Sequence, residues 1–210
     1  MSELATLLVE LESRWTKKGS SDSACMAPGL DREVVIGMLE ANGLPAPAEL
    51  ADWFGWHDGV NVELAGSRWV LLAPAAFMPF SLHEALEERE SWIQDAGRVA
   101  AEAGAEFGPE LPEVQEPSFW WESTWLPIAR PAGGNVLAVD LAGTSDSVPV
   151  LVVEWSEIDD FREVRSESLT AFVRLLLDVP DPYWRWMPEE QRWVFDFAEL
   201  PMEFRGKSFF

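Results

Sequence analysis

Residues 125–155 constrain the fold most strongly, because they contain three strand-like segments separated by two polar turns. Trp125–Ala129 is a short apolar run, Asn135–Leu141 alternates between two faces, and Val148–Trp155 is apolar and rich in β-branched residues. The alternation places Leu137, Val139 and Leu141 on one face and Val136, Ala138 and Asp140 on the other. Short turns between consecutive strands predict an antiparallel meander.

Helical patterns surround this meander and predict a single α+β domain with an antiparallel or mixed central sheet. Apolar spacing and capping residues predict helices over 4–15, 32–42, 47–54, 81–103 and 166–179, and a last helix that starts at Pro188. Residues 19–28 and 104–118 have the composition of loops, whereas 68–72 is expected to form a strand and 159–164 a short strand or a turn.

The charge balance restricts the classes of partner. Fifteen Lys and Arg residues face 37 Asp and Glu residues, for a net charge of −22, which disfavours nucleic acid and anionic membranes as partners. The same charge suits a basic protein partner, although it also serves solubility alone. Cys25 is a single cysteine, so neither an intramolecular disulfide nor a cysteine-based metal site is expected. The N-terminus lacks a signal-peptide pattern, which predicts a cytoplasmic protein. Gly133-Gly134 lacks the surrounding P-loop or dinucleotide pattern, and no cofactor is expected.

The segment 83–122 is the most acidic part of the chain, with eleven acidic residues against Arg89 and Arg98. An aromatic centre with an acidic rim is a common arrangement at protein interfaces. We therefore predict a partner-binding patch here. Its members are Trp120, Trp121, Glu113, Glu116 and Glu122, with Trp56 and Asp58 as further candidates. The other tryptophans divide into an expected core set (Trp53, Trp69, Trp125, Trp155) and a tail set that is harder to bury (Trp184, Trp186, Trp193).

Residues for catalysis are few. His57 and His83 stand in no recognisable metal-ligand or catalytic pattern, so we predict no catalytic residue and no metal site. A glycosidase needs only two carboxylates and an aromatic groove, which keeps Asp140, Glu154, Asp159 and Asp160 open as an alternative. Asp140 also suits a turn or a cross-strand hydrogen bond.

Several motifs together resemble a known family. The run W-L-P-I-A-R-x-x-G-G-N-x-L-x-x-D-L starts at Trp125 and is followed by an apolar strand that ends at Glu154-Trp155. Pro47–Phe54 followed by His57-Asp58-Gly59, and Ser166–Val179, add the pattern of two helices. In this order the motifs resemble the SUKH superfamily, of Smi/Knr type. The residues that carry the likeness are Trp53, Phe54, Gly59, Trp125, Pro127, Gly133, Gly134, Asn135, Asp140, Glu154 and Trp155.

The resemblance implies three regions: an N-terminal helix and loop (1–29), a SUKH-like domain (30–180) with an acidic insertion at about 83–122, and an aromatic extension (181–210) packed on the domain. It also implies a binding module without catalysis of its own. In bacterial members that commonly means an immunity protein that neutralises a toxin, and a basic nuclease toxin would suit the acidity. A regulatory scaffold of the cell-wall regulator type and a carboxylate-dependent glycan hydrolase are the alternatives.

Overall fold

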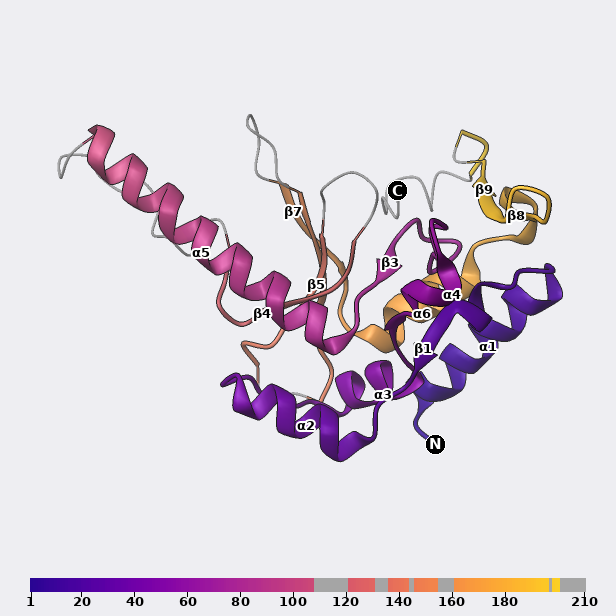
Figure 1. Ribbon diagram of the computed structural model, residues 1–210, viewed down its shortest axis with the longest axis horizontal. Coiled ribbons are helices and arrows are strands. Elements are labelled where there is room, and N and C mark those ends of the chain that lie inside the picture. The colour runs from indigo at the N-terminus through magenta and orange to yellow at the C-terminus, as the bar shows by residue number, and fades with distance from the viewer. Residues whose placement is uncertain (108–120, 131–135, 144–145, 155–160, 197, 201–210) are drawn as a thin grey trace.

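Five antiparallel strands form the central sheet of the computed structural model, which describes residues 1–107, 121–130, 136–143, 146–154, 161–196 and 198–200 (Figure 1). In spatial order the strands are β3 (Met78–Pro79), β4 (Trp125–Arg130), β5 (Val136–Asp140), β6 (Val150–Glu154) and β7 (Phe161–Ser166). Strands β4, β5 and β6 pair as consecutive antiparallel neighbours, which confirms the predicted meander. The predicted motif residues Gly133, Gly134, Asn135 and Trp155 lie outside the described residues.

The two faces of β5 belong to two different apolar cores, as its alternation predicts. Leu137 and Val139 join the larger core, whereas Val136 and Ala138 join a smaller one. All four side chains are at most 2% exposed, because both faces of the strand are covered. The sheet is therefore the middle layer of the molecule.

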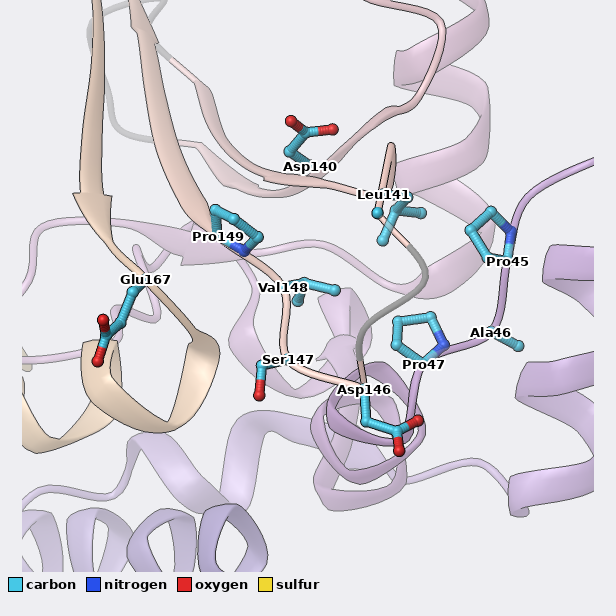
Figure 2. Close-up of a pocket in the computed structure, with 11 residues that line it drawn as sticks. Pro45, Ala46, Pro47, Asp140, Leu141, Asp146, Ser147, Val148, Pro149 and Glu167 are labelled. Carbon is cyan, nitrogen blue, oxygen red and sulfur yellow. The ribbon is translucent and has the colours of Figure 1, made fainter.

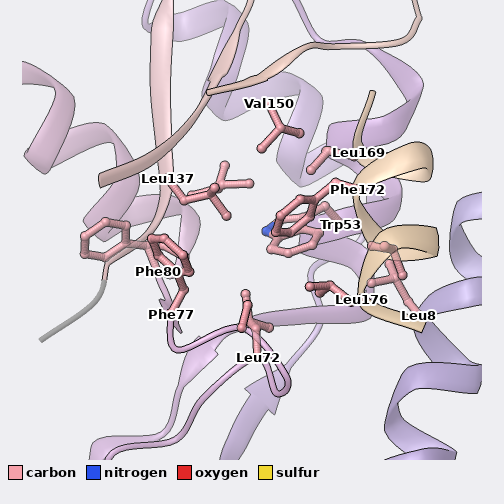
Figure 3. Close-up of a cluster of buried hydrophobic side chains, with 14 of the residues drawn as sticks. Leu8, Trp53, Leu72, Phe77, Phe80, Leu137, Val150, Leu169, Phe172 and Leu176 are labelled. Atoms are coloured by element: carbon pink, nitrogen blue, oxygen red, sulfur yellow. The ribbon is translucent and has the colours of Figure 1, made fainter. Parts of the chain in front are cut away.

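Helices from both ends of the sequence build the larger core (Figure 3). They are α1 (Glu3–Lys17), α3 (Ala48–Trp56) and α6 (Leu169–Asp178). The predicted stripe of α6, which includes Phe172 and Leu176, is fully buried and meets Trp53 of α3 and Leu137 of the sheet. The hydroxyl of Ser168 accepts a hydrogen bond from the Ala171 amide at 2.9 Å, so it caps α6. A fourth helix, α2 (Arg32–Ala41), packs on α3.

The long helix α5 (Leu82–Phe107) covers the other face of the sheet and extends beyond it (Figure 1). Ser81 and Glu84 form the predicted capping box. The Glu84 carboxylate accepts from the Ser81 amide at 2.8 Å, and the Ser81 hydroxyl accepts from the Glu84 amide at 3.1 Å. The helix continues past its predicted end near Ala103 into the segment expected to be a loop.

The C-terminal part corrects one prediction. Residues after Pro180 form a short 3₁₀ turn, η4 (Asp181–Tyr183), and the hairpin β8 (Trp184–Met187) to β9 (Arg192–Phe195), instead of a last helix from Pro188. Pro188 lies in the hairpin turn. Trp184, Trp186 and Trp193 are 1%, 7% and 4% exposed, so the hairpin buries the tryptophans that were expected to be hard to bury.

Other local predictions also differ from the structure. Residues 19–28 contain a 3₁₀ turn, η1 (Asp22–Cys25), and strand β1 (Met26–Pro28), which pairs with β2 (His57–Val60). Residues 68–72 form no strand and follow the short helix α4 (Val62–Ala65). Trp69, expected in the core, is 48% exposed. None of the described helices has the length and apolar composition needed to cross a lipid bilayer.

Candidate protein-binding site

A hollow of about 460 Å³ opens where the end of β5 meets the segment that leads into α3 (Figure 2). Pro45 and Pro47 line one side, and Val148 and Pro149 line the other. The carboxylates of Asp140, Asp146 and Glu167, which come from three different segments, surround this apolar surface. We call this feature the proline hollow.

Buried Glu49 fixes the walls of the proline hollow. It lies on α3, is 7% exposed, and accepts hydrogen bonds from the backbone amides of Val148 at 2.9 Å, Leu169 at 3.2 Å and Thr170 at 3.0 Å. The last two amides belong to the first turn of α6, where a helix dipole favours a negative charge. One carboxylate thus ties α3, the approach to β6 and the start of α6 together.

Asp140 has the structural role that was one of its predicted options. Its Oδ1 accepts from the Ala142 amide at 2.9 Å and from the Thr124 hydroxyl at 3.2 Å, so the carboxylate stabilises the turn after β5. It remains partly exposed at the edge of the proline hollow, whereas Asp146 and Glu167 are exposed.

The chemistry of the proline hollow suits the side chain of a lysine or arginine. The alkyl part of such a side chain is apolar and packs on proline and valine, while its charged head stays near solvent. The described lining contains carboxylates and includes no lysine or arginine. A lysine or arginine of a partner that enters the proline hollow is therefore attracted by these carboxylates, and no cation of the described lining competes for them.

The predicted patch around Trp121 needs a correction. Trp121 is 3% exposed and stacks on Trp92 of α5, with ring centroids 5.1 Å apart and planes at 24°. It also meets Trp125 edge-on at 5.5 Å. Its indole therefore supports α5 on the sheet and offers a partner no contact surface. Glu122 is partly exposed, while Trp120, Glu113 and Glu116 lie outside the described residues.

The exposed side of α5 nevertheless carries acidic groups. Glu87, Glu90 and Asp95 are exposed, whereas Trp92 packs toward the sheet. Arg89 donates to the Ser123 carbonyl at 2.5 and 2.9 Å, so its side chain is held on the sheet side of the helix. Among the described residues of the 83–122 segment, these acidic groups are thus presented by the outer face of α5.

The two other predicted contact residues have partners inside the molecule. Trp56 donates to Glu12 Oε2 at 3.2 Å and lies against Trp15 and Trp53. Asp58 accepts from the Leu82 amide at 2.7 Å, at the start of α5. Burial raises the pKa of the Asp58 carboxyl, and this hydrogen bond opposes the shift.

The motif residues that the structure describes are mostly structural. Trp53 and Phe54 are 2% and 0% exposed, and Trp125 is 8% exposed. Gly59 has a φ of +76°, and a Cβ there would lie 2.3 Å from the Ser81 amide nitrogen, so only glycine fits. Pro127 lies in β4 opposite Ala138. Glu154 ends β6.

The described histidines lie apart from the proline hollow and from each other. His57 Nδ1 is 3.0 Å from the Ala27 carbonyl, and its Nε2 is 3.6 Å from Glu12 Oε2, between α1 and β2. His83 is exposed on α5 beside Glu87. Of the carboxylates proposed for a hydrolase, Asp140 alone has a described side chain, and Asp159 and Asp160 lie outside the described residues. Within the described ranges, no group of three His, Cys, Asp or Glu side chains could hold a metal ion.

Sequence reasoning missed Glu49 and the rim residues Asp146 and Glu167. A signal for Glu49 was present, because it precedes Trp53 by four residues and therefore shares the buried face of α3. A charge on that face requires hydrogen-bond donors. Asp146 and Glu167 carried no comparable signal, since only the folded chain brings their segments together. No model of a known protein family matches this chain, and no curated protein matches it.

Proposed function

We propose that this chain is a non-catalytic protein-binding module that binds a basic protein at the proline hollow. The observation that carries the proposal is the apolar floor of the proline hollow, surrounded by the carboxylates of Asp140, Asp146 and Glu167. An arginine or lysine anchored there would gain both apolar contact and charge pairing. Well-packed side chains of this kind supply much of the energy of protein interfaces.

The charge of the whole chain supports the same proposal. A net charge of −22 draws a basic partner toward the surface and accelerates encounter, while the contacts in the proline hollow would set the lifetime of the complex. The acidic outer face of α5 adds to this field. Steering of this kind weakens as salt rises, because the Debye length shortens to about 3 Å at 1 M.

The most specific form of the proposal is an immunity protein of SUKH type that neutralises a bacterial toxin. The motifs around Trp125 and Asp58 support it through their resemblance to that superfamily. A nuclease toxin fits the chemistry best, because its active site binds phosphates and is therefore basic. Acidic side chains placed over that site would compete with the nucleic acid.

A pull-down from native lysate with the purified chain as bait tests the proposal. We expect it to retain a basic protein at about 50 mM salt and to lose it at about 500 mM, where charge pairs are screened. Added in excess, the chain should then block the activity of that protein. The proposal fails if no basic protein is retained at low salt. Retention that is insensitive to salt would favour the regulatory-scaffold alternative, because apolar contacts are little screened.

A further inference from the structure

A second recessed surface lies on a different part of the molecule, between α4 with its following loop and the edge strand β3. It has a volume of about 250 Å³ and is lined by residues that include Val62, Trp69, Met78, Phe80 and Arg130. We call it the Trp69 groove. Strand β3 is the end of the five-stranded sheet, so the groove runs along a sheet edge.

Large apolar side chains are exposed at the Trp69 groove. Val62 and Trp69, which line the groove, are 70% and 48% exposed, and Leu64, which belongs to the same segment but not to the lining, is 60% exposed. The three residues fall within eight consecutive positions of the chain. This clustering distinguishes them from single exposed apolar residues, which need no explanation. Apolar side chains that gather beside a recess indicate a place where another molecule binds.

Two arginines border the same recess in an otherwise strongly acidic chain. The Arg130 guanidinium lies 5.2 Å from the centre of the Phe80 ring, and it forms no ion pair with any carboxylate of the described residues. Arg68 is held by the Ala65 carbonyl at 3.4 Å and the Ser21 hydroxyl at 3.2 Å. The Arg68 charge also acts on the buried carboxyl of Asp22, whereas the Arg130 guanidinium packs on an uncharged ring, so Arg130 is the cation of the groove that is available to an anion.

One acidic residue also lines the Trp69 groove. Glu84 lines the recess, but its carboxylate accepts from the amide and the hydroxyl of Ser81 at 2.8 and 2.9 Å. Exposed Glu63 lies on α4 next to Val62 of the lining. The groove therefore carries charges of both signs, and Arg130 is the exposed group of its lining that can pair with an anion.

We propose that the Trp69 groove docks a short protein segment that places a large apolar side chain in the recess and a neighbouring carboxylate on Arg130. The recess is smaller than the roughly 300–1,000 Å³ of most small-molecule sites, so it fits one side chain better than a cofactor. Tryptophan and arginine are the residues most enriched at interface hot spots. This docking surface is separate from the proline hollow, with which it shares no lining residue.

Fluorescence anisotropy with synthetic peptides tests this proposal on the full chain. The first labelled peptide has a Leu-Phe centre flanked by glutamates, the second has lysines in place of the glutamates, and the third has serines in place of Leu-Phe. We expect saturable binding of the first peptide below about 1 mM and none of the other two. Trp69→Ala and Arg130→Glu should each weaken binding roughly tenfold or more.

Arg185→Glu is the matched control, because Arg185 is an exposed arginine on β8 that is not part of the groove lining. It changes the net charge as Arg130→Glu does and should leave peptide affinity unchanged. Equal binding of the acidic and basic peptides, equal affinity of all variants, or absence of saturable binding would each overturn the proposal. Self-association of the chain that Trp69→Ala abolishes, seen by sedimentation, would also overturn it by assigning the groove to a second copy.

Discussion

The indole N–H of Trp193 donates to Asp22 Oδ2 at 2.8 Å and joins the C-terminal hairpin to the turn that follows α1. Asp22 is 0% exposed. Burial raises the pKa of the Asp22 carboxyl to about 6, because the charged form loses its hydration. The hydrogen bond from Trp193, the Leu71 amide and the charge of Arg68 oppose this shift and limit it.

The raised pKa of Asp22 predicts a specific pH dependence. Between the ordinary aspartate pKa of 3.8 and about 6, the folded state binds this proton more tightly than the unfolded state, so the contribution of Asp22 to stability falls as pH rises through that window. The full change is about 3 kcal/mol. Urea unfolding at pH 4 and pH 7 measures this change. As pH rises, the free energy of unfolding of wild type should fall by about 3 kcal/mol relative to that of Asp22→Asn.

Exposed Asp196 supplies the control for that experiment. Asp196→Asn should leave the pH profile of the unfolding free energy parallel to that of wild type. Parallel profiles for wild type and Asp22→Asn would show that the Asp22 carboxyl titrates normally, contrary to its burial.

Glu49 is also a buried carboxylate, but both of its oxygens accept hydrogen bonds. Glu49→Gln places an amide group against donors from Val148, Leu169 and Thr170, so at least one donor loses its acceptor. We expect a loss of about 1.5–3 kcal/mol in the free energy of unfolding, measured by urea titration. Glu33→Gln on the exposed side of α2 is the matched change and should cost less than about 0.5 kcal/mol. Equal effects of the two variants would contradict the role of Glu49.

At the level of elements, α5 depends on tryptophan packing from a distant part of the chain. The stack of Trp92 on Trp121, and the contact of Trp121 with Trp125, hold the helix on the sheet. Trp121→Ala is expected to cost about 3–5 kcal/mol, because it leaves a cavity in the smaller core. Hydrogen exchange should accelerate in α5 and leave the β8–β9 hairpin unchanged.

Trp69→Ala is the natural comparison, since Trp69 is 48% exposed. It should cost less than about 1 kcal/mol and leave the exchange of α5 unchanged. If Trp121→Ala were equally harmless, the indole of Trp121 would be free to serve as a contact residue, as the sequence pattern alone suggested.

The elements that could be predicted from sequence are those whose period is visible locally. The alternation around Leu137 and the stripe around Phe172 each determine one element and its buried face. The C-terminal hairpin was missed because Pro188 and its acidic neighbours suit a helix start and a turn equally well. Its defining contact, Trp186 opposite Trp193, depends on pairing across that turn.

At the level of the whole molecule, two recessed surfaces differ in the charges that line them. The described lining of the proline hollow contains carboxylates and no lysine or arginine, whereas that of the Trp69 groove contains Arg68 and Arg130 together with Glu84. The acidity and the class of partner could be argued from composition, but the location of the site could not. Asp140, Asp146 and Glu167 converge only because Glu49 ties α3, the approach to β6 and α6 together.

The most direct test of the central claim is the affinity of the isolated basic partner for two charge-reversal variants at about 150 mM salt. Asp146→Lys with Glu167→Lys alters the proline hollow, and Glu189→Lys with Glu199→Lys alters exposed acids in the C-terminal part. Each pair changes the net charge by the same amount. We predict a loss of roughly tenfold or more for the first pair and less than about threefold for the second. Equal affinities of the two variants would contradict binding at the proline hollow.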